Sequence, residues 1–147
     1  MKEKIANYIY DETIPFIFMG TDHVISIIVF AILSFAIPYL AQKNLDEDQK
    51  YFLGKVIGVL ILFGYVSWVI LEILAGTFNL KLHLPFHLCR TANILIFVVL
   101  FFRSFLAYEI VFFWGLTVIH AVVTPDITQG FPHYHFIRYW LTHQLMI

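Results

Sequence analysis

The chain has 147 residues, of which 61% are hydrophobic and 13% are charged, and its net charge is −1. A soluble domain is typically about half apolar and about a quarter charged, so this composition indicates a protein whose solvent is lipid. The lack of a basic surface excludes nucleic acid as a partner, because nothing would neutralise the phosphates. The single cysteine excludes an intrachain disulfide.

The first twenty residues are predicted to form an interfacial segment rather than a membrane span. Tyr8, Tyr10, Phe16 and Phe18 are mixed with acidic residues in this part of the chain. Side chains with an apolar body and a polar tip favour the level of the lipid headgroups. We therefore expect residues 1–20 to lie along the membrane surface.

Four apolar stretches are predicted to be membrane-spanning helices, since a span needs about 20 mostly apolar residues. They cover residues 21–41, 55–75, 85–103 and 108–124, and a fifth helix is expected to start near residue 135. The fifth stretch is too short to span, which predicts a truncated chain whose remaining helices are missing. The apolar runs do not alternate, so strands are not expected. The predicted fold is an all-α polytopic bundle, a single transmembrane domain over residues 1–147 of a multi-pass cell-membrane protein.

Gly58 and Gly64 lie in the second predicted span, and Gly54 directly precedes it. Small residues let helix backbones approach closely in a membrane. This face of the helix is therefore predicted to pack against a neighbouring helix.

The polar residues are expected to gather at one membrane face. Helical hairpins bring together the start of the first, third and fifth helices and the end of the second and fourth. A charge at the centre of a bilayer costs about 2.5–3.5 kcal/mol and usually faces an interior or a water-filled cavity. We therefore predict a polar pocket at this face. Its candidate lining residues are Glu72, His87, Arg90, Asn93, His120, Asp126 and His133.

Cys89 is the candidate nucleophile, because a helix N-terminus and the adjacent Arg90 both stabilise a thiolate. The alternative is that the thiol is a small buried hydrophobic group. His87 lies about 160° away from Cys89 around the helix, so a base must come from another span. His143 in the fifth helix is the first candidate and His120 the second. A helix–helix hydrogen bond is the alternative role of His143.

Three other patterns have simpler explanations. His133 and His135 have the spacing of metal ligands but lack a third ligand, so no metal and no cofactor is predicted. Glu72 and Arg90 are predicted to form a buried ion pair, because an unpaired charge there would be costly. Asp126, in the sequence TPD, fits a turn at the end of a helix.

Several motifs together resemble the YwaF-type family of bacterial integral membrane proteins. They are LPFHLCR, FFWGLTVIHAVVTPD and GFPHYHFIRYWLTHQ, and the likeness extends from about residue 67 to the end of the chain. A distant vertebrate relative of this family, transmembrane protein one-six-four, is a cysteine-dependent phospholipid acyltransferase. Its histidine matches His143, and its cysteine lies at the start of the same third helix, at Cys89 or at Phe86.

The resemblance implies a thiol that attacks a phospholipid ester and then passes the acyl group to a lysolipid, with membrane lipids as the partners. Two other classes of function remain open from the residues. The pocket could bind a lipid headgroup or an ion without chemistry, as in a transporter. The protein could also be a membrane scaffold whose polar groups pair with one another.

Overall fold

The computed structural model describes residues 2–11, 13–85 and 88–146. Within these ranges the chain is all-α, as predicted, and its only strand-like feature is an isolated bridge between Pro15 and Gln129. The helices are α1 (Lys2–Ile9), α2 (Thr21–Asn44), α3 (Glu47–Ala75), α4 (Leu80–His83), α5 (Leu88–Phe102), α6 (Phe105–Val123) and α7 (Tyr134–Leu145).

The four predicted spans are confirmed only in part. Among the described residues, α2 and α3 are long and apolar enough to cross a membrane. The other apolar segments, α5 and the Phe105–Gly115 part of α6, are shorter. The predicted first and second spans are therefore present as long helices, whereas a four-span bundle stays a prediction.

The helix α3 begins at Glu47, earlier than the predicted residue 55, because Asp46 caps it. The Asp46 carboxylate accepts a hydrogen bond from the Gln49 backbone N–H at 2.8 Å, and the Gln49 side chain accepts one from the Asp46 N–H at 3.1 Å. This reciprocal pair satisfies two backbone donors at a helix start. At the other end, Gly76 has a φ of 78°, a conformation that favours glycine and terminates the helix.

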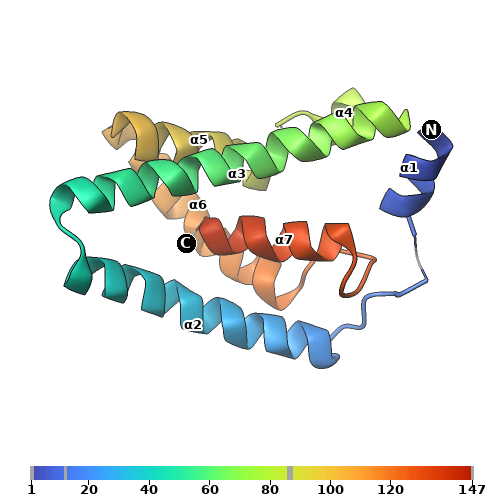
Figure 1. Cartoon of the computed structure of the whole chain (residues 1–147), viewed down its shortest axis with the longest axis horizontal. Coiled ribbons are helices and arrows are strands. Elements are labelled where there is room, and N and C mark those ends of the chain that lie inside the picture. Colours follow the sequence, from blue (N-terminus) through green and yellow to red (C-terminus); the bar gives the residue numbers. More distant parts are fainter. Residues whose placement is uncertain (1, 12, 86–87, 147) are drawn as a thin grey trace.

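The helices α2 and α3 form the two diverging arms of a long hairpin, and α7 lies between them in Figure 1. Along its length α3 packs on α5, and α5 packs on α6. The short α1 packs against α3, at the end of α3 that precedes α4 (Figure 1). A small apolar core forms where α2, α6 and α7 meet; its buried members are Phe30, Val118, Val122, Phe136, Tyr139 and Trp140.

The arm formed by α2 keeps many large apolar side chains exposed. Ile25, Ile32 and Phe35 have 53%, 59% and 80% of their surface accessible. Only a minority of its residues are buried, among them His23 and Phe30. An apolar helix with so few internal contacts fits a helix that faces lipid tails.

His23 connects the start of α2 to the end of α6. Its Nδ1 accepts a hydrogen bond from the Met19 backbone N–H at 3.0 Å, and its Nε2 lies 3.2 Å from the Val122 carbonyl oxygen. Both ring nitrogens of a fully buried histidine are thus satisfied when Nε2 carries the proton. This histidine is a structural connection between the two helices.

The N-terminal segment is partly helical and is connected to the loop before α7. The Phe16 backbone N–H donates to the Thr128 carbonyl, and the Gly130 N–H donates to the Ile14 carbonyl, both at 2.8 Å. The segment therefore lies beside the start of α7. Its location at the membrane interface stays a prediction.

The glycine face of α3 contacts two neighbouring helices. A Cβ atom added at Gly58 would lie 3.4 Å from Leu100 and 3.6 Å from Phe97 on α5. At Gly64 it would lie 3.3 Å from the Thr142 side chain on α7. The absence of side chains therefore sets how closely α3 approaches both helices.

We expect Gly58→Leu to lower the free energy of unfolding by about 1–3 kcal/mol, because the larger side chain would force α5 away from α3. The measurement is a titration from mild detergent into dodecyl sulfate, followed by circular dichroism. Gly115→Leu is the control, since an added Cβ there meets no described atom within 4 Å. An equal loss in both variants would contradict the close-packing role of Gly58.

Candidate functional site

A buried carboxylate, Glu72, lies near the end of α3 and is 1% exposed. Its Oε2 accepts hydrogen bonds from the Tyr10 hydroxyl at 2.8 Å and the Thr77 hydroxyl at 2.6 Å. Its Oε1 accepts one from the Trp68 indole Nε1–H at 2.9 Å, and the His83 Nε2 lies 3.6 Å from Oε2. Both oxygens are therefore satisfied by groups from four separate positions in the chain.

The hydroxyls of Tyr10 and Thr77 and the indole N–H of Trp68 donate hydrogen bonds to the Glu72 carboxylate. Burial, followed by the hydrogen bond to Glu72, raises the pKa of the Tyr10 hydroxyl, so this group keeps its proton at neutral pH. In His83, the Nδ1 lies 2.8 Å from the Asn79 backbone nitrogen and 2.9 Å from the Asn79 carbonyl oxygen, and the Nε2 faces the carboxylate. The predicted ion pair between Glu72 and Arg90 is wrong, because Glu72 has these partners instead.

Arg90, near the start of α5, lies over the Trp68 ring, with its Cζ 4.5 Å from the ring centroid. Arg138 on α7 lies over the same ring at 4.6 Å. Both are within cation–π range. The Nη1 of Arg90 and the Nε of Arg138 are buried and have no hydrogen-bond partner. The site therefore concentrates two cations around one indole and leaves donors of both unsatisfied.

Arg138 is a site residue that is not among the predicted pocket residues. Its signal in the sequence is a lone arginine within the apolar run HFIRYWL. An arginine at such a position needs an aromatic or anionic partner in the fold. The sequence does not reveal that this partner is Trp68, which lies 70 positions earlier in the chain.

Cys89 is the second residue of α5 and is half-buried. It lies near Tyr139 on α7 and directly precedes Arg90 in the chain. The Tyr139 ring stacks on the His143 ring, with the centroids 4.1 Å apart. The thiol and the His143 imidazole thus both lie near Tyr139, although no hydrogen bond joins Cys89 to His143 in the described part of the chain.

His143 is buried, and its Nδ1 lies 2.7 Å from the Tyr139 carbonyl oxygen. A carbonyl can only accept, so the proton of the neutral ring is on Nδ1 and the lone pair is on Nε2. This is the tautomer in which Nε2 can take up a proton.

The remaining predicted pocket residues are dispersed. His120 and Asp126 are exposed, whereas Asn93 is buried with its Oδ1 unpartnered. His133 caps α7: its Nδ1 accepts from the His135 N–H, and its Nε2 lies 2.9 Å from the Tyr8 carbonyl oxygen. With both nitrogens of His133 occupied, the two histidines are no metal-ligand pair. His87 and Phe86 lie outside the described residues.

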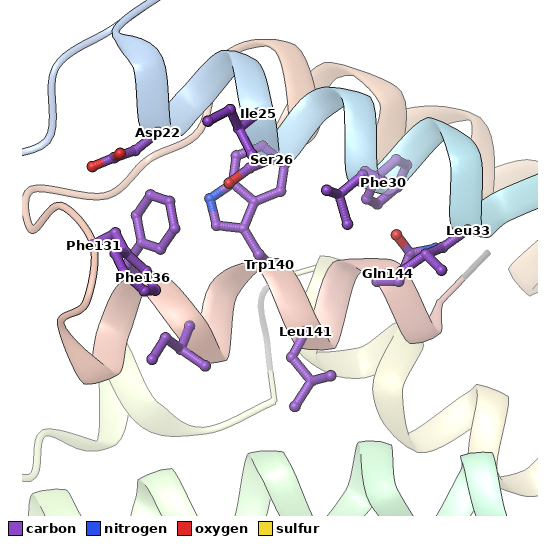
Figure 2. A pocket seen from close by; sticks show the side chains of 12 residues that line it. Asp22, Ile25, Ser26, Phe30, Leu33, Phe131, Phe136, Trp140, Leu141 and Gln144 are labelled. Carbon is purple, nitrogen blue, oxygen red and sulfur yellow. The ribbon is translucent and has the colours of Figure 1, made fainter.

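An apolar groove of about 460 Å³ lies between α2 and α7, and Figure 2 shows its lining. Trp140 of α7 projects toward α2 there, and its buried Nε1 has no partner. Asp22 and Gln144 are among the few polar side chains of the groove. None of the predicted site residues lines it, so it is distinct from the predicted polar cavity.

We expect Glu72→Ala to reduce the free energy of unfolding by about 2–5 kcal/mol, because it leaves several buried donors without an acceptor. The quantity is measured by the same detergent titration. Glu109→Ala serves as the control, since Glu109 is exposed on α6. If both variants unfold alike, Glu72 does not hold this end of the molecule together.

Comparisons with known proteins support one family. The model of the TMEM164 family matches residues 18–147 of the chain. An uncharacterized protein of Treponema pallidum (strain Nichols) is 30% identical over 118 residues, which make up 80% of this chain and 46% of that protein. The chain thus spans about half the length of the curated relative it matches. No solved structure matches. These matches support the relationship to transmembrane protein one-six-four, and not the YwaF type specifically.

Proposed function

Because the chain belongs to the TMEM164 family, we propose that it is a multi-pass membrane protein that transfers acyl groups of phospholipids through Cys89. Family membership and the two long apolar helices indicate association with a membrane. In the proposed arrangement α2, α3, α5 and α6 all span the bilayer of the cell membrane. The acyl groups come from, and return to, lipids of that membrane.

The observation that carries the proposal is that Cys89 and His143 both lie near Tyr139. The thiol lies in the first turn of α5 and directly precedes Arg90. The Tyr139 ring, which lies near Cys89, stacks on the ring of His143 on the same helix α7. The proposed nucleophile and the proposed base thus come from two different helices, α5 and α7.

His143 fits the role of the base because its free nitrogen is Nε2. The Tyr139 carbonyl fixes the ring through Nδ1, in the way that a third group orients the base of a catalytic pair. The ring must approach the thiol more closely than in this structure. Such contacts commonly tighten only when substrate is bound.

The proposed reaction has two steps. In the first, the Cys89 proton passes to the His143 Nε2, and the sulfur attacks the carbonyl carbon of a phospholipid ester. A carbon–sulfur bond forms, the ester carbon–oxygen bond breaks, and the lysophospholipid leaves with the proton from His143. In the second, a hydroxyl of an acceptor lysolipid gives its proton to His143 and attacks the thioester, which restores the ester and the free thiol.

We expect the protein, incubated with phospholipid that carries a labelled acyl chain, to form a hydroxylamine-sensitive adduct on Cys89. Cys89→Ala should abolish the adduct, and the result is unambiguous because the chain has one cysteine. His143→Ala should slow adduct formation by a factor on the order of 10²–10⁴, the usual contribution of a general base. Mass spectrometry of the intact protein over time provides the rates.

Glu109→Ala is the matched control, because Glu109 is exposed on α6 and should leave the rate unchanged. If the wild-type thiol acquires no acyl group, or if Cys89→Ala keeps full lipid-remodelling activity, the acyltransferase proposal is wrong. A ligand-dependent gain in stability that survives Cys89→Ser would then favour the second candidate, a lipid-binding protein without chemistry. The unsatisfied donors of Arg90 and Arg138 are the observation in favour of that candidate.

A further inference from the structure

We propose that Arg90 and Arg138 together bind a phosphate group beside Cys89, that of a phospholipid headgroup. The choice of a lipid as the source of the phosphate rests on the proposed function. The binding of phosphate itself rests on the charges and the unsatisfied donors described below.

The first argument is charge balance around Trp68. Glu72 attracts both guanidinium groups electrostatically but forms an ion pair with neither, since its oxygens are taken by neutral donors and His83. In the described part of the chain, the ion pairs are Glu72–His83 and Lys50–Glu47. Two cations therefore share one carboxylate at a distance, and an additional anion would balance them.

The second argument is the excess of donors. The Nη1 of Arg90, the Nε of Arg138 and the hydroxyl of Tyr134 are all buried without a partner. Tyr134 lies one turn before Arg138 on α7. Each group can donate a hydrogen bond and lacks an acceptor, and native structures rarely leave buried donors unsatisfied. A phosphate supplies several acceptor oxygens at once.

The third argument is spacing. The Cζ atoms of Arg90 and Arg138 lie 4.5 and 4.6 Å from the same ring centroid, so they are at most about 9 Å apart. A phosphate at the edge of the indole can accept hydrogen bonds from guanidinium groups that lie over the ring. Because Arg90 directly follows Cys89 in α5, a headgroup held there would bring its ester bonds toward the thiol.

The chain contains its own control, because it has three arginines, Arg90, Arg103 and Arg138. Phenylglyoxal modifies arginines, and mass spectrometry measures the rate at each one in the wild-type protein. We expect phosphatidylglycerol to slow modification of Arg90 and Arg138 by a factor on the order of ten, and to leave Arg103 unchanged. Diacylglycerol with the same chains has no phosphate and should protect neither.

Two results of this experiment would overturn the proposal: no protection by phosphatidylglycerol, or equal protection by diacylglycerol. Inorganic phosphate is the third probe. Weaker protection by inorganic phosphate than by phosphatidylglycerol supports a headgroup site. Protection by inorganic phosphate alone overturns the assignment to a lipid and identifies free phosphate as the ligand.

Variants provide an independent measurement in the full chain. Arg90→Gln and Arg138→Gln should each weaken phosphatidylglycerol binding, measured by native mass spectrometry, about tenfold or more. Arg103→Gln is the matched control, since Arg103 also lies over an aromatic ring, 3.9 Å from the centroid of Tyr51. The Arg103→Gln variant loses the same charge and the same type of cation–π contact, but at a different place in the molecule. Unchanged binding in folded Arg90→Gln and Arg138→Gln would refute the site.

Cys89→Ala separates the two proposals. This variant should form no adduct but bind phosphatidylglycerol with wild-type affinity, because the arginines are intact. A wild-type protein that binds phosphate through the arginines but never forms an adduct contradicts only acyl transfer. An adduct whose formation is indifferent to both arginines contradicts only the phosphate site.

Discussion

The Glu72 carboxylate is the interaction on which this end of the molecule depends. A carboxylate that is 1% exposed costs several kcal/mol to bury unless hydrogen bonds satisfy it. Its partners come from the segment after α1, from α3 itself, from the segment after α3 and from α4. One buried group therefore fixes the positions of short segments that have little apolar surface of their own.

The same carboxylate determines the orientation of Trp68. Because the indole N–H donates to Glu72, the plane of the ring is fixed, and both guanidinium groups lie over that plane. The hydrogen bond between Trp68 and Glu72 thus fixes the ring over which the Arg90 and Arg138 guanidinium groups lie, and Arg90 directly follows Cys89. Two buried histidines are held in a similar way. His23 has a hydrogen-bond partner at each ring nitrogen. His83 has a backbone partner at Nδ1 and faces the Glu72 carboxylate through Nε2.

Much of the helical architecture could be predicted, because apolar length is a local property of the chain. The apolar pattern predicts the start of α3 at residue 55, whereas the helix begins at Glu47, although the capping pair Asp46 and Gln49 is visible in the sequence DEDQ. The apolar pattern alone carries no information about a polar first turn. The partners of Glu72 could not be predicted either, because Tyr10 lies 62 positions away and is brought close only by the packing of α1 on α3.

The connection between the N-terminal segment and α7 has a consequence for biosynthesis. His133 contacts the Tyr8 carbonyl across 125 positions, so the residues around α1 leave the ribosome long before their partner exists. Until α7 is made, the Tyr8 carbonyl lacks this partner, although α1 can already pack on α3. The entropic cost of closing the loop between Tyr8 and His133 grows only with the logarithm of its length. The order of translation thus makes the docking of α7 the event that completes the site.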